Sequence, residues 1–156
     1  MKDVIEYLLS NELTISTMES CTGGALASNI TNFENSSKIF KFGAVTYSNE
    51  FKIKFGVKRK TIKEYSVYSI ETAKEMSRRI SKYSKSTIGV GITGKLNKPD
   101  DENPFESDNS VFLSIYDKRD KTYLVKKIDV LKSRRKDNKN EVIEAFVDMF
   151  KIKYNL

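Results

Sequence analysis

Residues 13–30 read LTISTMESCTGGALASNI, and this stretch decides the fold class. Residues 13–18 alternate apolar and small polar side chains, which is typical of a short strand. Apolar residues then recur at helical spacing from Ala25 to Ile30, so a helix is expected there. Gly23-Gly24 lies between the two patterns and permits a tight turn. The stretch therefore predicts a strand, a turn and a helix in immediate succession.

The same periodicities extend this unit along the chain. They predict helices at 3–11, 50–55, 69–82 and 140–154, and strands at 42–47, 87–92, 111–116 and 123–128. Residues 93–109 hold both prolines and several acids, which indicates a long loop. Strands interleaved with helices predict one domain, residues 1–156, of the α/β class: a three-layer α/β/α sandwich with a mixed sheet. Functional sites in such sheets lie where a strand ends and the connection to a helix begins, so Ser20 and Ile92 mark candidate positions.

Composition narrows the function classes. With 38% hydrophobic and 31% charged residues, the chain has the composition of a globular protein. It shows no run of about 18 apolar residues, so we expect no membrane partner. The single cysteine, Cys21, excludes an intramolecular disulfide and suits a cytoplasmic location. The absence of histidine excludes Ser-His-Asp and Cys-His catalysis, so any base must be Lys, Tyr, Asp or Glu.

A formal charge of +7 suits anionic partners, either phosphorylated metabolites or nucleic acid. The lysines of residues 38–63 are spread along the chain, which favours a solvated surface over one binding stripe. We therefore rank nucleic acid behind a small anionic ligand. Residues 132–139 include Arg134 and Arg135, and their charges fit either a phosphate contact or simple solvation.

The turn after the first strand has the residues of a nucleophile site. Ser20 follows the strand, and backbone N–H groups and the helix dipole behind it can stabilise negative charge. Ser20 or Thr22 can equally well be a helix cap, because serine and threonine often cap helices. A serine nucleophile without histidine needs another base, and a lysine with a lowered pKa can serve. Lys52, just after the second strand, is one candidate among many lysines.

Two further patterns are weaker. Gly89 and Gly94-Lys95 have the spacing of a phosphate-binding P-loop, but Leu96 stands where that motif needs Ser or Thr. We therefore reject a nucleotide triphosphatase. Cys21 is an alternative nucleophile, yet it lacks a histidine partner, and a lone cysteine is usually a small buried residue.

Taken together, four segments resemble the C-terminal domain of the CinA family, the nicotinamide-nucleotide amidohydrolases. These segments are Glu19–Gly24, Ser36-Ser37, Val45–Lys52 and Gly91–Gly94. The resemblance implies that a stand-alone domain hydrolyses the carboxamide of nicotinamide mononucleotide without a metal or cofactor. It also implies a homo-oligomer, with a dimer favoured.

Carried onto matching positions, the resemblance makes Ser20 the nucleophile, Lys52 its base and Tyr47 the hydroxyl that assists proton transfer. The turn at Cys21–Gly24 is then an oxyanion or phosphate cradle. The residues it assigns to substrate binding are Glu19, Cys21, Thr22, Gly23, Gly24, Gly91, Thr93, Gly94 and Arg135.

The sequence also departs from the family pattern. Lys95-Leu96-Asn97 replaces the usual proline and glycine pair, and Asn109-Ser110 replaces Gly-Thr. Leu96 and Asn97 adopt positive φ angles less freely than glycine, so we expect a reshaped loop. The second hypothesis is therefore a catalytically silent binding domain with an accessory role in DNA uptake or damage responses, as the family's name suggests.

Overall fold

The computed structural model describes residues 1–97 and 109–156. The first half of the chain alternates short helices with two strands, and the second half contains three strands between two long helices. In chain order the elements are α1 (Lys2–Ser10), β1 (Ile15–Glu19), α2 (Ala25–Thr31), α3 (Ser36–Ile39), β2 (Phe40–Val45), α4 (Asn49–Lys54), α5 (Arg59–Tyr65), α6 (Ile70–Ser84), β3 (Ile88–Gly94), β4 (Ser110–Asp117), β5 (Thr122–Asp129) and α7 (Arg135–Tyr154).

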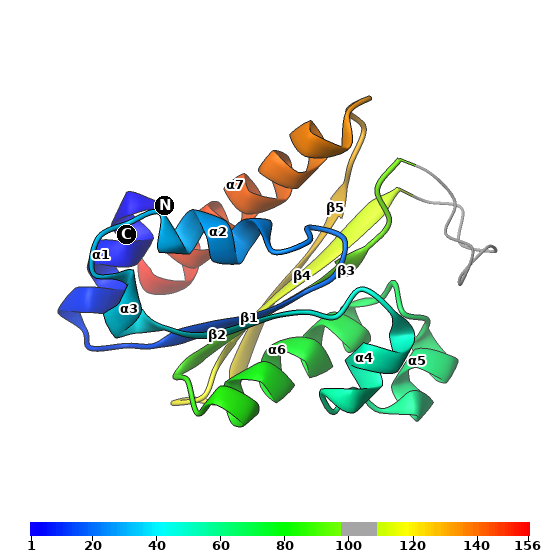
Figure 1. Ribbon diagram of the computed structural model, residues 1–156, viewed down its shortest axis with the longest axis horizontal. Helices are drawn as coiled ribbons and strands as arrows, with labels where there is room; N and C mark the ends of the chain where they lie inside the picture. Colours follow the sequence, from blue (N-terminus) through cyan, green and yellow to red (C-terminus); the bar gives the residue numbers. More distant parts are fainter. Residues whose placement is uncertain (98–108) are drawn as a thin grey trace.

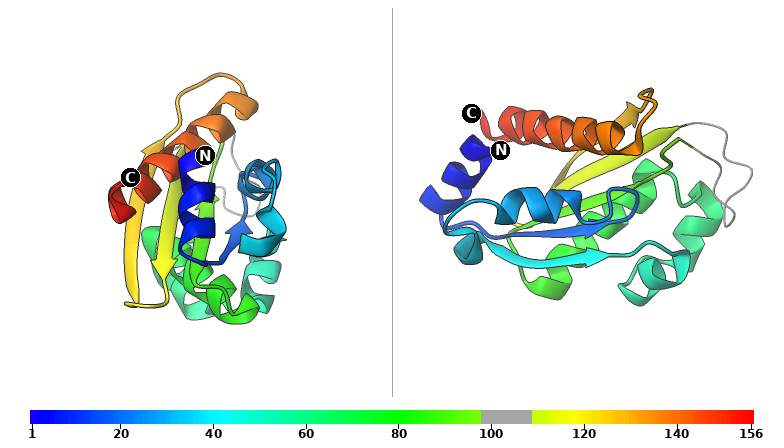
Figure 2. Two further views of the ribbon diagram at one scale, coloured as in Figure 1. Left: turned by 90° about the vertical axis from the view of Figure 1, so that its left-hand side faces the viewer. Right: turned by 45° about the horizontal axis from the view of Figure 1, so that its top comes forward.

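The strands form one mixed sheet in the order β2-β1-β3-β4-β5. β1 pairs in parallel with both β2 and β3, whereas β4 pairs antiparallel with β3 and β5. Helices α1, α2 and α7 cover one face of the sheet, and α4, α5 and α6 lie on the other (Figures 1 and 2). The predicted α/β/α sandwich with a mixed sheet is therefore confirmed.

Two apolar clusters hold the three layers together. The larger one joins α1, α2 and α7 to the sheet and includes Leu8, Ile15 and Phe146, each of which is fully buried. The smaller one lies under α6 and includes Met18, Met76 and Ile80. β1 contributes to both clusters, because successive strand residues point to opposite faces of a sheet.

Glycines allow β3 to pack directly against α6. A Cβ on Gly89 would lie 2.0 Å from the carbonyl oxygen of Ser77, and one on Gly91 would lie 2.3 Å from that of Ala73. These separations are far shorter than a van der Waals contact, so only glycine fits. Gly91, which we predicted as a substrate contact, is therefore placed by the structure on the side of the sheet that α6 covers.

Several boundaries differ from the sequence-based expectation. α3 and α5 were not predicted: α3 has only four residues, and α5 buries none of its side chains, so neither shows a clear apolar stripe. α7 begins at Arg135, whereas we predicted a start at residue 140. The prediction missed the first turns because they are mostly charged and show no apolar stripe. Of the predicted loop 93–109, Thr93 and Gly94 belong to β3, and both prolines fall in 98–108, outside the described residues. Among the residues that are described, every helix is too short or too polar to cross a bilayer.

We predict that Gly89→Ala lowers the free energy of unfolding by at least about 2 kcal/mol, because the added methyl group overlaps the Ser77 carbonyl. Urea denaturation measures this loss. Ser16→Ala is the matched control, since Ser16 is the register partner of Gly89 on β1 and its buried hydroxyl finds no hydrogen-bond partner among the described residues. This control should change stability by less than about 1 kcal/mol. Equal losses in both variants would contradict the packing argument.

Candidate active site

Ser20 lies at the edge of the sheet where three parallel strands end. Its N–H donates to the carbonyl oxygen of Ile92 on β3 at 3.0 Å. On the other side, the N–H of Thr46, just past β2, donates to the carbonyl of Glu19 at 2.8 Å. These bonds fix the backbone on both sides of Ser20, at the strand ends where we expected chemistry.

Lys52 reaches the same point from α4. The hydroxyl of Ser48 caps this helix by accepting from Phe51 N–H at 3.3 Å. The Lys52 side chain is only 2% exposed. Its Nζ donates to Ser20 Oγ at 3.0 Å and to the carbonyl oxygens of Thr46 at 2.8 Å and Tyr47 at 3.4 Å. The chain thus joins the two predicted catalytic residues directly.

This arrangement suits Lys52 as a base. Removal from water favours the neutral form of an amine, which has two N–H groups and one lone pair. In that form, the carbonyls of Thr46 and Tyr47 can take the two N–H groups while the lone pair accepts the proton of Ser20. The contact therefore has the geometry that proton transfer from the hydroxyl requires.

Glu19 organises the turn from inside. Its carboxylate is fully buried and accepts from Thr22 Oγ1 at 2.7 Å, Leu26 N–H at 3.1 Å and Ala27 N–H at 2.9 Å. Two N–H groups of the first turn of α2 are therefore occupied by this carboxylate. We predicted Glu19 as a substrate contact and Ser20 or Thr22 as an alternative helix cap. In the structure Glu19 has the capping role, and Thr22 helps to hold it.

The turn from Cys21 to Gly24 has backbone N–H groups that no backbone carbonyl of the described residues accepts. Gly23 and Gly24 have φ angles of +63° and +91°, which favour glycine. Gly23 N–H donates to the Ser20 carbonyl at 3.0 Å. The N–H groups of Cys21, Thr22 and Gly24 donate to no carbonyl among the described residues. Such a series of backbone N–H groups can bind an anion.

Basic residues of α7 border the turn. Arg135 donates from Nη2 to the hydroxyl of Tyr47 at 3.3 Å and from Nη1 to the carbonyl of Leu96. Tyr47 is 64% exposed, so its ring lies at the surface beside the buried Lys52. One helical turn further along α7, the Lys139 ammonium lies 3.3 Å from where a Cβ on Gly23 would be. Sequence reasoning did not predict the contact between Arg135 and Tyr47.

The remaining predicted binding residues face the protein interior. Thr93 is fully buried and donates to the carbonyl of Val67 at 2.9 Å. A Cβ on Gly94 would lie 2.5 Å from the carbonyl of Ser110, so this glycine allows β3 and β4 to pack closely. Together with Gly91, these residues belong to β3, whose Ile92 carbonyl accepts from Ser20 N–H.

Leu96-Asn97, where the sequence departs from the family pattern, contacts α7 and the segment that precedes it. Leu96 is buried, and Asn97 adopts a φ of +65°, which asparagine tolerates better than most residues. Asn97 donates to the carbonyl of Lys132 at 2.7 Å and accepts from Nδ2 of Asn138 at 2.7 Å. Side-chain hydrogen bonds thus fix this loop beside the segment that carries Arg135.

Comparison with known proteins identifies the family. The model of the CinA C-terminal domain matches residues 1–153. The chain belongs to the CinA family. A protein of Caldanaerobacter subterraneus subsp. tengcongensis named competence-damage inducible protein is 38% identical over 92% of this chain and 34% of its own length. One from Clostridium perfringens is 47% identical over 57% of this chain and 22% of its own length. The CinA domain thus spans about a third or less of these curated relatives.

Solved structures agree with the fold of this CinA domain. The competence/damage inducible protein CihA from Agrobacterium tumefaciens has a TM-score of 0.82 at 25% identity, with 95% of this chain and 92% of that chain covered. A CinA superfamily protein from Enterobacter cloacae has a TM-score of 0.86 at 20% identity, with 96% and 88% covered. At that lower identity the second likeness concerns the fold alone.

Other chemistries receive no support from the described part of this CinA domain. β3 runs from Ile88 to Gly94, so the residues with P-loop spacing form an extended strand and not a phosphate-binding loop. Across 1–97 and 109–156, no group of three or more His, Cys, Asp or Glu side chains gathers to hold a metal ion. Cys21 packs in the larger apolar cluster, and burial raises the pKa of its thiol to about 12.

We predict that Cys21 resists alkylation in the folded protein. With a pKa of about 12, roughly one thiol in ten thousand is ionised at pH 8, and the thiolate is the reactive form. Iodoacetamide labelling followed by intact-mass measurement should show little modification of the native chain. Labelling should be rapid in urea, where the pKa returns to about 8.5. Fast labelling of the native chain would revive Cys21 as a nucleophile.

Proposed function

We propose that this CinA domain hydrolyses the carboxamide of nicotinamide mononucleotide to nicotinate mononucleotide and ammonia. The observation that carries the proposal is the 3.0 Å hydrogen bond between Lys52 Nζ and Ser20 Oγ, both buried, in a chain without histidine. The family resemblance supplies the substrate class. Further support comes from the contact of the Ser20 hydroxyl with the Lys52 amine and from the N–H groups of the adjacent turn.

In the first step, Ser20 Oγ attacks the carboxamide carbon while its proton passes to neutral Lys52. The carbonyl oxygen becomes an oxyanion, and we assign its stabilisation to the N–H groups of Cys21 and Thr22. Lys52 then returns the proton to the amide nitrogen, the carbon–nitrogen bond breaks, and ammonia leaves. The product of this half-reaction is an ester on Ser20.

In the second step, water attacks the ester carbon and gives a proton to Lys52. The carbon–oxygen bond to Ser20 breaks, the proton on Lys52 returns to Ser20 Oγ, and the acid product leaves as its carboxylate after releasing its own proton to solvent. We assign the Tyr47 hydroxyl to assist the proton transfers of Lys52, as the resemblance suggests. Its bond to Arg135 would orient that hydroxyl.

The phosphate of the substrate would lie toward α7. Arg135 and Lys139 are four residues apart and therefore share one helical face. Lys139 borders Gly23, and Arg135 borders Tyr47, so both cations lie at the rim of the Ser20 turn. The N-terminus of α2 is a less suitable place for phosphate, because Glu19 already occupies two of its N–H groups.

Ser20→Ala and Lys52→Met should each reduce ammonia release from nicotinamide mononucleotide by at least about 100-fold, because one removes the nucleophile and the other its base. A coupled assay for ammonia measures the rate. Lys54→Met is the matched control: Lys54 lies on the same helix, is exposed, and contacts Glu50 and the Phe51 ring. It should keep the wild-type rate. An active Ser20→Ala protein, or an inactive wild type, would contradict the proposal.

Lys139→Ala should raise KM for nicotinamide mononucleotide roughly tenfold with little change in kcat, because a lost charge-assisted bond to phosphate costs about 1.4 kcal/mol or more. The same variant should leave KM for nicotinamide riboside, which lacks the phosphate, unchanged. Lys136→Ala, one position from Arg135 and exposed, controls for loss of charge on α7. Equal effects on both substrates would contradict a phosphate contact.

A further inference from the structure

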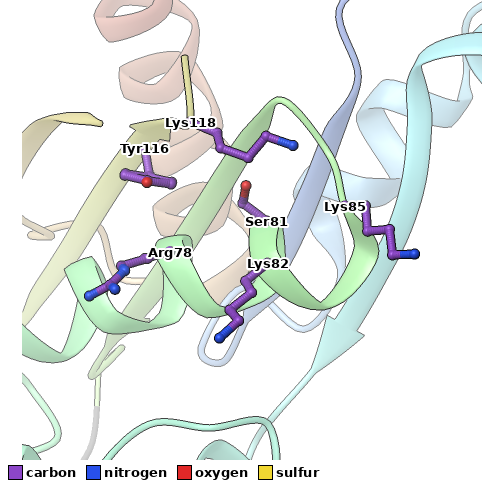
Figure 3. Close-up of a pocket in the computed structure, with 6 residues that line it drawn as sticks. All are labelled: Arg78, Ser81, Lys82, Lys85, Tyr116 and Lys118. Atoms are coloured by element: carbon purple, nitrogen blue, oxygen red, sulfur yellow. The ribbon is translucent and has the colours of Figure 1, made fainter. Parts of the chain in front are cut away.

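A second basic site lies at the other end of the sheet. A pocket of about 290 Å³ is lined by the last turns of α6 and the end of β4, and its six lining residues are Arg78, Ser81, Lys82, Lys85, Tyr116 and Lys118 (Figure 3). Lys85 precedes β3, and the N–H of Lys118 donates to the carbonyl of Thr87 at 2.9 Å, so the pocket borders the start of β3. Ser20 borders the end of the same strand. The two sites are therefore distinct.

The positive charge of this pocket is not neutralised by neighbouring acids. None of the six lining residues is acidic. Among the described residues, no carboxylate forms an ion pair with Arg78, Lys82, Lys85 or Lys118. The nearest acid on α6, Glu75, instead contacts Lys58 through the backbone N–H at 2.7 Å and the ammonium at 3.7 Å.

Asp117, the acid next to Lys118 in the chain, is also paired with other residues. Asp117 is 1% exposed and accepts from the Arg119 guanidinium and from the hydroxyl of Tyr154 at 2.9 Å. Four exposed cations thus share one surface, and none of them has a carboxylate partner within residues 1–97 and 109–156. Such a concentration of like charge is unfavourable by itself and attracts anions.

The arrangement of the cations selects the kind of anion. The charged ends of Arg78, Lys82 and Lys85 point in different directions and do not meet at one point (Figure 3). All four cations are exposed, so a single phosphate would find no buried, convergent donors. Residues 74, 78 and 82 of α6 are four apart and form a basic row with a rise of about 6 Å per step. An extended chain of phosphates matches such a row better than a small ion.

We propose that this surface, which we call the α6 basic surface, binds the phosphate backbone of nucleic acid. The contacts are electrostatic and independent of base sequence. The Tyr123 ring beside the row does not offer a free face for stacking on a base, because the Lys74 ammonium lies over it at 4.9 Å from its centroid. Tyr116 is largely buried beneath the pocket and adds no stacking surface. This proposal is independent of the amidohydrolase reaction at Ser20.

The test is fluorescence anisotropy with a labelled 20-nucleotide single-stranded DNA in low salt. The triple variant Arg78→Glu/Lys82→Glu/Lys85→Glu should weaken binding at least tenfold. It should also reduce the slope of log K against log salt by about 2, because three phosphate contacts are lost. Lys38→Glu/Lys41→Glu/Lys63→Glu is the charge-matched control, since these three exposed lysines do not line the pocket and the net charge changes by the same amount. It should bind almost as well as the wild type.

Three results of the DNA assay would overturn the proposal: no binding by the wild type in low salt, equal loss in both triple variants, or displacement of the DNA by inorganic phosphate beyond the effect of chloride at equal ionic strength. The last result would mark a small-anion site. Tighter binding to phosphatidylglycerol vesicles than to DNA would point to a membrane surface and would also overturn it. Ser20→Ala should bind DNA like the wild type, which separates this test from that of the amidohydrolase.

Discussion

The hydrogen bond between buried Lys52 and Ser20 is the constraint on which the site depends. An amine removed from water must find acceptors, because an unsatisfied buried polar group costs several kcal/mol, on the order of 2–7. Lys52 finds them in Ser20 Oγ and in the carbonyls that follow β2. This requirement fixes three segments at once: the turn after β1, the chain leaving β2, and α4. The parallel pairing of β1 with β2 is what brings the two strand ends together.

Much of the fold follows from the sequence, because its long elements have clear periodicity. The strand, turn and helix around Ser20, the hairpin of β4 and β5, and helix α6 all lie close to their predicted positions. The misses have physical causes. α5 buries no side chain, and the first turns of α7 are charged, so neither segment shows the apolar stripe on which the prediction relies.

The site was less accessible to sequence reasoning. From residue types alone, Lys52 was one lysine among many, and only the family resemblance singled it out. The inward direction of Glu19 and the packing roles of Gly91 and Thr93 depend on tertiary contacts that no local pattern encodes. The cations of the α6 basic surface are also scattered between α6 and the end of β4 in sequence. Folding gathers them, so a count of spread lysines could not reveal them.

The proposed reaction requires a covalent ester on Ser20, and that intermediate distinguishes it from direct attack by water. The most direct measurement is intact-protein mass spectrometry of enzyme quenched in acid during turnover of nicotinamide mononucleotide, followed by peptide mapping. The account predicts an adduct with the mass of the nicotinate mononucleotide acyl group on the peptide that contains Ser20, absent from Ser20→Ala. Continued ammonia release without any adduct, or an adduct on Cys21, would contradict the assignment of Ser20 as nucleophile.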